Sequence, residues 1–181
     1  MIDSFNPPDV WPPFGPFSMA VVQRDGRIVH LKGQVSLDQT GRIVGRGDMH
    51  AQTRKVLENI QTLLASFGGR MQDIVSLTQY VTDFDAFIET RALRREFFAP
   101  PFPVTTTVQV VRLYDPALLV EITAIAEIPR ERFRQPFVPR VGGAFSGSGR
   151  SRARLVFLAR RSARGAGRGR GSRPGRAAGP G

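Results

Sequence analysis

The chain has 181 residues and a mass of 20.0 kDa, which suits one ordinary domain with an appendage. It contains no cysteine and only two histidines, which excludes disulfides, thiol chemistry and a cysteine-ligated or multi-histidine metal site within one chain. We therefore expect neither a metal nor another cofactor. No apolar run reaches the ~18–20 residues that span a bilayer, and the N-terminus carries acids and prolines where a signal peptide has a basic start. We expect a soluble cytoplasmic protein that makes no membrane contact.

The net charge of +11 is distributed unevenly along the chain. Residues 1–129 hold 12 basic and 14 acidic residues, whereas residues 130–181 hold 14 arginines and a single acid, Glu131. The high isoelectric point therefore belongs to the C-terminal segment and says nothing about the rest of the protein. We expect an N-terminal extension at 1–13, a folded domain at 14–129 and a tail at 130–181.

The tail from about residue 140 consists mainly of Arg, Gly, Ala, Ser and Pro, and it buries too little apolar surface to offset its ordering entropy. We predict that it is disordered. Three interpretations remain open: a solvated basic extension, an arm that contacts nucleic-acid phosphates through arginine, and translation of a shifted reading frame in GC-rich DNA. Only the nucleotide sequence can decide on the third.

In the first half of the domain, Ser18–Arg24 and Arg27–Gly33 read as two strands joined in a hairpin at Asp25-Gly26. A second turn is predicted at Gln39–Arg42. A helix then begins at Asp48, whose carboxylate can cap the first turn, and it ends at Gly68-Gly69. Its apolar residues recur on one face of a 3.6-residue period: Val56, Leu57, Ile60, Leu63, Leu64 and Phe67.

In the second half, Asp73–Thr82 reads as a strand and a second helix runs from Asp83 or Asp85 to about Phe98. Two more strands are predicted at Thr105–Arg112 and Leu119–Ile128. The inner stripe of the second helix is predicted to comprise Phe84, Phe87, Ile88, Ala92 and Phe97. The order ββαβαββ predicts an α+β fold in which one mixed sheet carries both helices on one face.

Successive side chains of a strand point to opposite faces of a sheet, which sorts the residues of the last two strands. One side is apolar and is expected under the helices; it includes Thr106, Val108, Val110, Val120, Ile122, Ala124 and Ala126. The other side carries Thr105, Thr107, Gln109, Glu121 and Thr123. This second side is either open to water or shared with another subunit, and composition does not choose between the two.

Several stretches of the domain resemble, in order, the RidA/YjgF family, also called the reactive intermediate deaminase or L-PSP family. The matching stretches are Gly15–Ser18, Leu31–Val35, Ala51–Ile60, Gly68-Gly69, Asp73–Val75, Val81–Asp83, Phe97-Phe98, Thr106–Val110 and Val120–Ala126. The resemblance implies a chorismate-mutase-like fold, a homotrimer with a central barrel, and three clefts between adjacent subunits. It also implies hydrolysis of enamine or imine intermediates to 2-keto acids and ammonia. Older members were described as ribonucleases, and others bind small metabolites without established catalysis.

The family's site carries over only in part. Where deaminating members have an arginine that grips the substrate carboxylate, this chain has Thr105, which offers one neutral hydrogen bond and no charge. Glu121 matches the glutamate thought to orient the attacking water or relay its proton. The other matching positions, at which the resemblance implies substrate contacts, are Phe17, Gly33 and Thr107.

Two further cations could supply the missing charge, Arg91 on the second helix and Lys32 beside Gly33, although exposed surface charge is the simpler interpretation of both. Neither His30 nor His50 has an evident catalytic partner. Whether the chain is an enzyme stays open. The first hypothesis is an imine or enamine hydrolase of weak or altered specificity, and the alternative is a trimer whose clefts bind a small metabolite without turnover. The partners implied are a second copy of the chain and a small anionic or imine-type metabolite, with nucleic acid only through residues 140–181.

Overall fold

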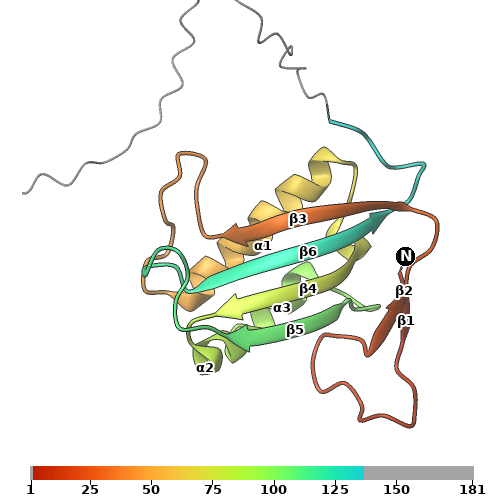
Figure 1. Ribbon diagram of the computed structural model, residues 1–181, viewed down its shortest axis with the longest axis horizontal. Coiled ribbons are helices and arrows are strands. Elements are labelled where there is room, and N and C mark those ends of the chain that lie inside the picture. The colour runs from red at the N-terminus through yellow and green to blue at the C-terminus, as the bar shows by residue number, and fades with distance from the viewer. Residues whose placement is uncertain (1, 137–181) are drawn as a thin grey trace, which may run out of the picture. The chain divides into compact units, whose positions relative to one another are not determined.

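A four-stranded mixed sheet forms the centre of the protein in the computed structural model, which describes residues 2–136 (Figure 1). The strand order is β3-β6-β4-β5, so β3 and β5 are the two edges. Strands β4 and β5 run parallel, and the other neighbours are antiparallel. The strand bounds are Arg27–Val35 for β3, Ile74–Val81 for β4, Val104–Gln109 for β5 and Val120–Ile128 for β6. The mixed sheet predicted from the sequence is confirmed.

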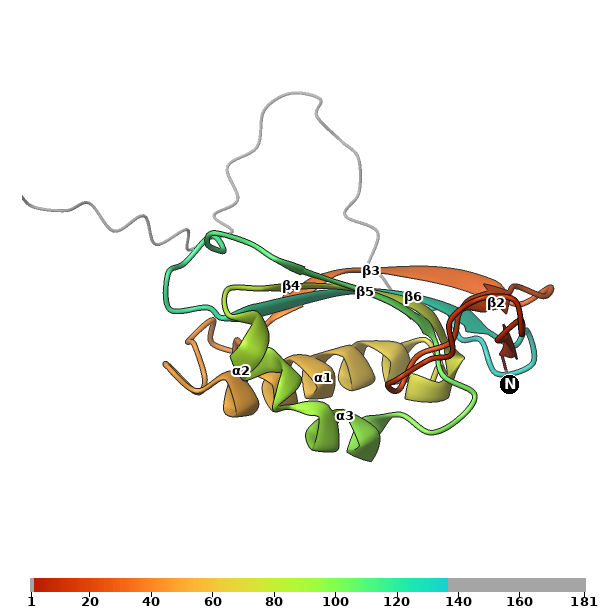
Figure 2. The same ribbon diagram turned by 90° about the horizontal axis from the view of Figure 1, so that it is seen from below.

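All the helices lie on one face of this sheet, as the edge-on view shows (Figure 2). They are α1 (Met49–Ser66), the short 3-10 turn η1 (Met71–Asp73), α2 (Phe84–Ile88) and α3 (Arg91–Phe97). The core between sheet and helices is apolar, with fully buried residues from α1 packed against β4 and β6. The opposite face, called the open face below, carries no helix of residues 2–136.

Helix α1 begins and ends where the sequence predicts. The Asp48 carboxylate accepts a hydrogen bond of 2.9 Å from the Ala51 amide, which satisfies one free donor of the first turn. At the other end Gly68 adopts φ +78°, and the amides of Gly68 and Gly69 close back onto the carbonyls of Ala65 and Leu64. The predicted inner face is buried at Val56, Leu57, Ile60 and Leu64, and Leu63 and Phe67 pack at its margin.

The second predicted helix is divided into α2 and α3 at Glu89-Thr90. Thr90 is 1% exposed, and its hydroxyl donates a 2.7 Å hydrogen bond to the Phe87 carbonyl. A threonine that bonds the preceding turn in this way competes with the helical backbone pattern. Of the predicted inner stripe, Phe87 is fully buried, whereas Ala92 is exposed and Phe84 is 39% exposed.

The predicted hairpin at Asp25-Gly26 is wrong. Strand β2 (Ala20–Val22) pairs with β1 (Asp3–Phe5) in a separate two-stranded sheet, while β3 pairs with β6. The reason lies in two carboxylates. Glu127 accepts hydrogen bonds from the amides of Arg24 and Gly26 and so holds the turn open, and Asp3 pairs with Arg24 and ties β1 to β2.

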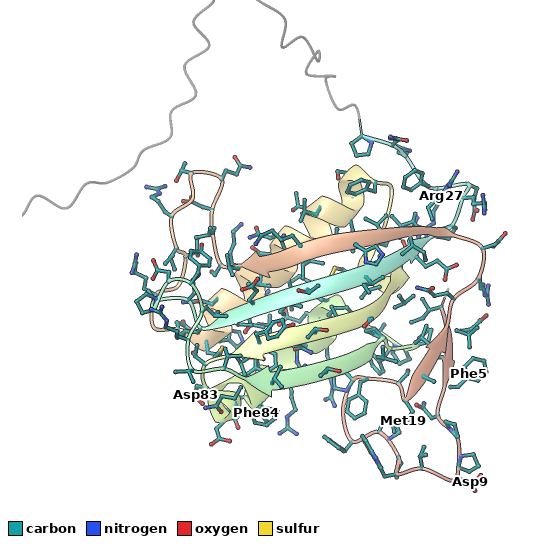
Figure 3. All side chains as sticks on the ribbon, viewed as in Figure 1. Phe5, Asp9, Met19, Arg27, Asp83 and Phe84 are labelled. Atoms are coloured by element: carbon teal, nitrogen blue, oxygen red, sulfur yellow. The ribbon has the colours of Figure 1, made fainter. Side chains whose placement is uncertain are left out.

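Strand β5 presents the opposite faces to those predicted. Thr105 lies beside Leu77, Thr107 beside Gln79 and Gln109 beside Val81, all on the helix side. Gln109, the last residue of β5, accepts a hydrogen bond of 3.2 Å from the amide of Phe84, the first residue of α2. Figure 3 shows Phe84 near this end of β5. The remaining residues of β5 point to the open face, and Val108 is 43% exposed there. For β6 the prediction is correct, because Val120, Ile122, Ala124 and Ala126 are buried and Glu121 and Thr123 are not.

The segment after β6 packs onto the end of α1. Arg132 pairs with the buried carboxylate of Asp73 through hydrogen bonds of 2.9 and 2.5 Å, and it also donates to the Gly68 carbonyl. Phe133 packs at the margin of the core. The predicted basic tail beyond residue 136 lies outside the described residues. Within residues 2–136 no helix has both the length and the apolarity to cross a bilayer.

Candidate functional site

Glu121 and Gly33 form a close pair at the end of β3 and the start of β6. A Cβ added at Gly33 would lie 2.0 Å from Oε1 of Glu121 and 2.8 Å from its Cδ, so only glycine leaves room for the carboxylate in this position. Glu121 is half-buried, and its side chain makes no hydrogen bond or ion pair with residues 2–136. A carboxylate held in this way is free to accept a proton from a ligand or a water molecule.

A second group of predicted site residues gathers around the start of β5. The Ser18 amide donates a 3.0 Å hydrogen bond to the Pro103 carbonyl, which places the half-buried Phe17 beside this strand. The Phe17 ring packs edge-on against Phe14 at 5.2 Å. A pocket of about 350 Å³ lies here, lined among others by Phe17, Pro101 and Phe102. Thr105 follows two residues after Pro103 on the helix side of the strand.

Beside Gln79 lies a cation that was not predicted from the sequence, Arg94 of α3. Its Nη1 donates a 3.2 Å hydrogen bond to Oε1 of Gln79, the register neighbour of Thr107, and its guanidinium lies 5.0 Å from the ring centre of Phe87. Burial lowers the pKa of Arg94, and the charge of the nearby Arg91 lowers it further. Gln79, Arg94, Thr105 and Thr107 are called the β5-edge cluster below.

The two groups do not meet within one copy of the chain. Glu121 lies beside Tyr80, which lies beside Val108, three residues along β5 from Thr105. With strands ~4.8 Å apart and a rise of ~3.3 Å per residue, the backbones of Glu121 and Thr105 are about 14 Å apart. Their side chains also point to opposite faces of the sheet. One chain therefore presents two half-sites, on opposite faces of its sheet.

The remaining candidates are more exposed. Arg91 is exposed at the first turn of α3, one turn from Arg94. Lys32 is also exposed, and with Lys55 it lines a separate pocket of about 430 Å³ beneath the end of β3, with Gly33 and Asn59 in its wall. His30 and His50 are exposed on β3 and α1. Within the described part of the chain no cluster of His, Asp and Glu could hold a metal ion.

Comparison with known proteins places this arrangement in a family. The model of the family described as Endoribonuclease L-PSP matches residues 9–128. The chain belongs to this family, the RidA/YjgF family. A RutC family protein of Pyrococcus horikoshii is 37% identical over 115 residues, which are 63% of this chain and 88% of the relative.

Solved structures agree with this assignment. A Rid family protein of unknown function from Yersinia pestis is 35% identical, with a TM-score of 0.65 over 70% of this chain and 98% of that one. RidA from an Antarctic Psychrobacter is 29% identical, with a TM-score of 0.53 over 64% of this chain and 91% of that one. The resemblance and the α+β fold class inferred from the sequence are confirmed.

Proposed function

We propose that this RidA/YjgF member hydrolyses imine or enamine intermediates to 2-oxo acids and ammonia. The observation that carries the proposal is the Glu121–Gly33 pair. A structural glutamate on a strand normally has a partner, whereas the Glu121 carboxylate has none within residues 2–136 and is accommodated by a residue without a side chain. In the reaction, Glu121 accepts a proton from water as the water oxygen bonds to the imine carbon, and it gives this proton to the nitrogen. The second proton then passes from the new hydroxyl group through Glu121 to the nitrogen, the C–N bond breaks, and ammonia leaves as the carbonyl forms.

We also propose that two copies of the chain build each site. The Glu121–Gly33 pair of one copy would lie against the β5-edge cluster of the next, as in the homotrimer that family membership implies. This arrangement joins two half-sites that point to opposite faces of the sheet within one chain. Head-to-tail contact of this kind closes into a ring, with one site at each interface.

Thr105 favours a second candidate, a trimer that binds a small metabolite without turnover. Its hydroxyl supplies no charge, and catalysis requires groups that stabilise the transition state more than the bound substrate. The two candidates differ in what Glu121 does: proton transfer in the first, and packing or a hydrogen bond to the ligand in the second.

The test measures imine lifetime directly. An amino-acid oxidase generates 2-imino acids, and semicarbazide captures what survives. The wild type is compared with Glu121→Gln and with the control Glu58→Gln, which alters another half-buried glutamate, on α1. The proposal expects wild type and control to shorten the imine lifetime and Glu121→Gln to lose at least 100-fold in rate. If the wild type is inert and the variant Thr105→Arg is active, the result would instead support the second candidate, a trimer that binds a metabolite without turnover.

A further inference from the structure

Arg94 is a half-buried cation that pairs with no anion among residues 2–136. Within residues 2–136 five arginines pair with carboxylates: Arg24, Arg42, Arg54, Arg130 and Arg132. Arg94 forms no such pair, although its Nε is fully buried and its charge is partly removed from water. Buried charges are normally paired, because desolvation without compensation is costly. The charge of Arg94 therefore calls for an anion, and none of residues 2–136 supplies one.

The side chains around Arg94 fix its position but do not neutralise it. Gln79 is 1% exposed and accepts from Nη1, and the Phe87 ring lies against the guanidinium. Both are neutral. The Gln79 amide nitrogen and Arg94 Nε are buried donors with no acceptor among residues 2–136. The cluster thus holds a surplus of donors.

One terminal nitrogen remains available to a ligand. Nη2 of Arg94 has no acceptor within the described residues, and it is not fully enclosed as Nε is. Through its bond to Gln79 the guanidinium lies on the helix side of the sheet, one strand from the edge strand β5. The half-buried hydroxyls of Thr105 and Thr107 line the same side. Nη2 is therefore the donor that an added acceptor would meet.

We propose that Arg94, held by Gln79, binds the carboxylate of the 2-imino acid substrate in place of the arginine for which this chain has Thr105. A planar guanidinium suits a planar carboxylate, and a partly desolvated site strengthens the attraction. This inference rests on the proposed function, because it identifies the cation of the same two-copy site. Arg94 binds the substrate, and Glu121 of the neighbouring copy acts on the imine carbon.

The first experiment measures the dissociation constant of 2-oxobutyrate, a stable product of the proposed reaction, by calorimetry. Arg94→Gln is expected to weaken binding about 30-fold, the lower end for loss of one partner of a desolvated charge pair. Arg95→Gln, which alters an exposed arginine at the next position of α3, should bind like the wild type. The methyl ester of 2-oxobutyrate, which has no carboxylate, should bind weakly and equally to all three.

Other results would overturn the inference. One is wild-type affinity in Arg94→Gln, and another is no binding of 2-oxobutyrate by the wild type. A third is a changed oligomeric state or melting temperature with unchanged affinity, which would assign Arg94 to a carboxylate of the partner copy. If Arg94→Gln does not fold, NMR of the wild type replaces this variant. The signal followed is the Arg94 Nε–H resonance, which is assigned by its loss in Arg94→Lys. That resonance must move on addition of 2-oxobutyrate and stay fixed with the ester.

The same variants separate this inference from the proposed function. Glu121→Gln should abolish imine hydrolysis but change the affinity for 2-oxobutyrate by less than about threefold, because it leaves the charge pair intact. A wild type that binds 2-oxobutyrate through Arg94 but hydrolyses no imine would refute the enzyme and retain the carboxylate site. Hydrolysis that is unaffected by Arg94→Gln would refute the carboxylate site and retain the enzyme.

Mixing the two variants tests whether they act across an interface. In rings formed from equal amounts of Glu121→Gln and Arg94→Gln chains, about one quarter of head-to-tail interfaces join an intact Glu121 to an intact Arg94. About a quarter of wild-type activity should therefore return after unfolding and refolding the mixture together. No recovery from a mixture shown to contain mixed oligomers would place both groups in one chain, against the site proposed here.

Discussion

Replacing Gly33 with alanine tests the Glu121–Gly33 pair without touching the carboxylate itself. The added Cβ would lie 2.0 Å from Oε1 and 2.9 Å from Cγ of Glu121, whereas atoms in ordinary contact are ~3.5 Å apart. The side chain of Glu121 must therefore swing away by roughly 1.5 Å. A displacement of ~1 Å at a reacting group can cost ~100-fold in rate, so we expect kcat/KM for imine hydrolysis to fall about 100-fold.

The same change should leave the fold nearly intact. Gly33 is not among the glycines with positive φ, and the clash is with a side chain that can rotate. Alanine also stabilises by about 0.4–1 kcal/mol by restricting the unfolded chain, which offsets part of the clash. Urea unfolding should show Gly33→Ala to be more favourable in a Glu121→Ala background than in the wild type. Equal effects in both backgrounds, or full activity in Gly33→Ala, would refute the reasoning.

Three further predictions concern stability, each measured by urea unfolding. Gly68→Ala should cost more than about 2 kcal/mol, because φ is +78° and the new Cβ would lie 2.0 Å from the Arg132 carbonyl oxygen. The control Gly47→Ala has φ +74° but open space around the new Cβ, and it should cost only about 1 kcal/mol. Equal costs for the two variants would exclude the clash. Asp73→Asn should cost about 1.5–3 kcal/mol by removing the charge that Arg132 pairs with, and a neutral result would contradict that role. Asp48→Ala should cost about 1 kcal/mol by removing the cap of α1 while Asp48→Asn restores most of it, and equal losses would argue against capping.

Local chemistry explains why α1 could be predicted closely from the sequence. Its start depends on one side-chain bond from Asp48, its end on the backbone freedom of Gly68, and its buried face on a regular period. None of these requires knowledge of the rest of the chain. Glu121 and Gly33 were likewise found from the sequence, but only through the family resemblance. Their contact depends on the register between β3 and β6, which no local pattern specifies.

Strand β5 shows where the alternation of side chains along a strand does not predict which face of the sheet each one points to. Residues 104–109 contain only Val, Thr and Gln, so the two faces differ little in hydrophobicity. Its faces are instead set by parallel pairing with β4, whose Leu77 and Val81 belong to the core. That pairing turns Thr105, Thr107 and Gln109 toward the helices. The predicted assignment failed because the deciding contrast lies in the neighbouring strand.

Arg94 escaped prediction for a related reason, because its contact also lies outside its own helix. In an uninterrupted helix from Asp83, position 93 would lie opposite the predicted stripe of Phe84, Phe87, Ile88 and Ala92. The Thr90 hydroxyl bond interrupts the helix, and α3 resumes with a different phase in which Leu93 is 1% exposed and Ala92 is exposed. Position 94 follows Phe87 by seven residues, but an arginine is normally expected in solvent unless it is paired. What holds Arg94 inward is its hydrogen bond to the buried Gln79 on β4, so no pattern within residues 83–98 could predict its place.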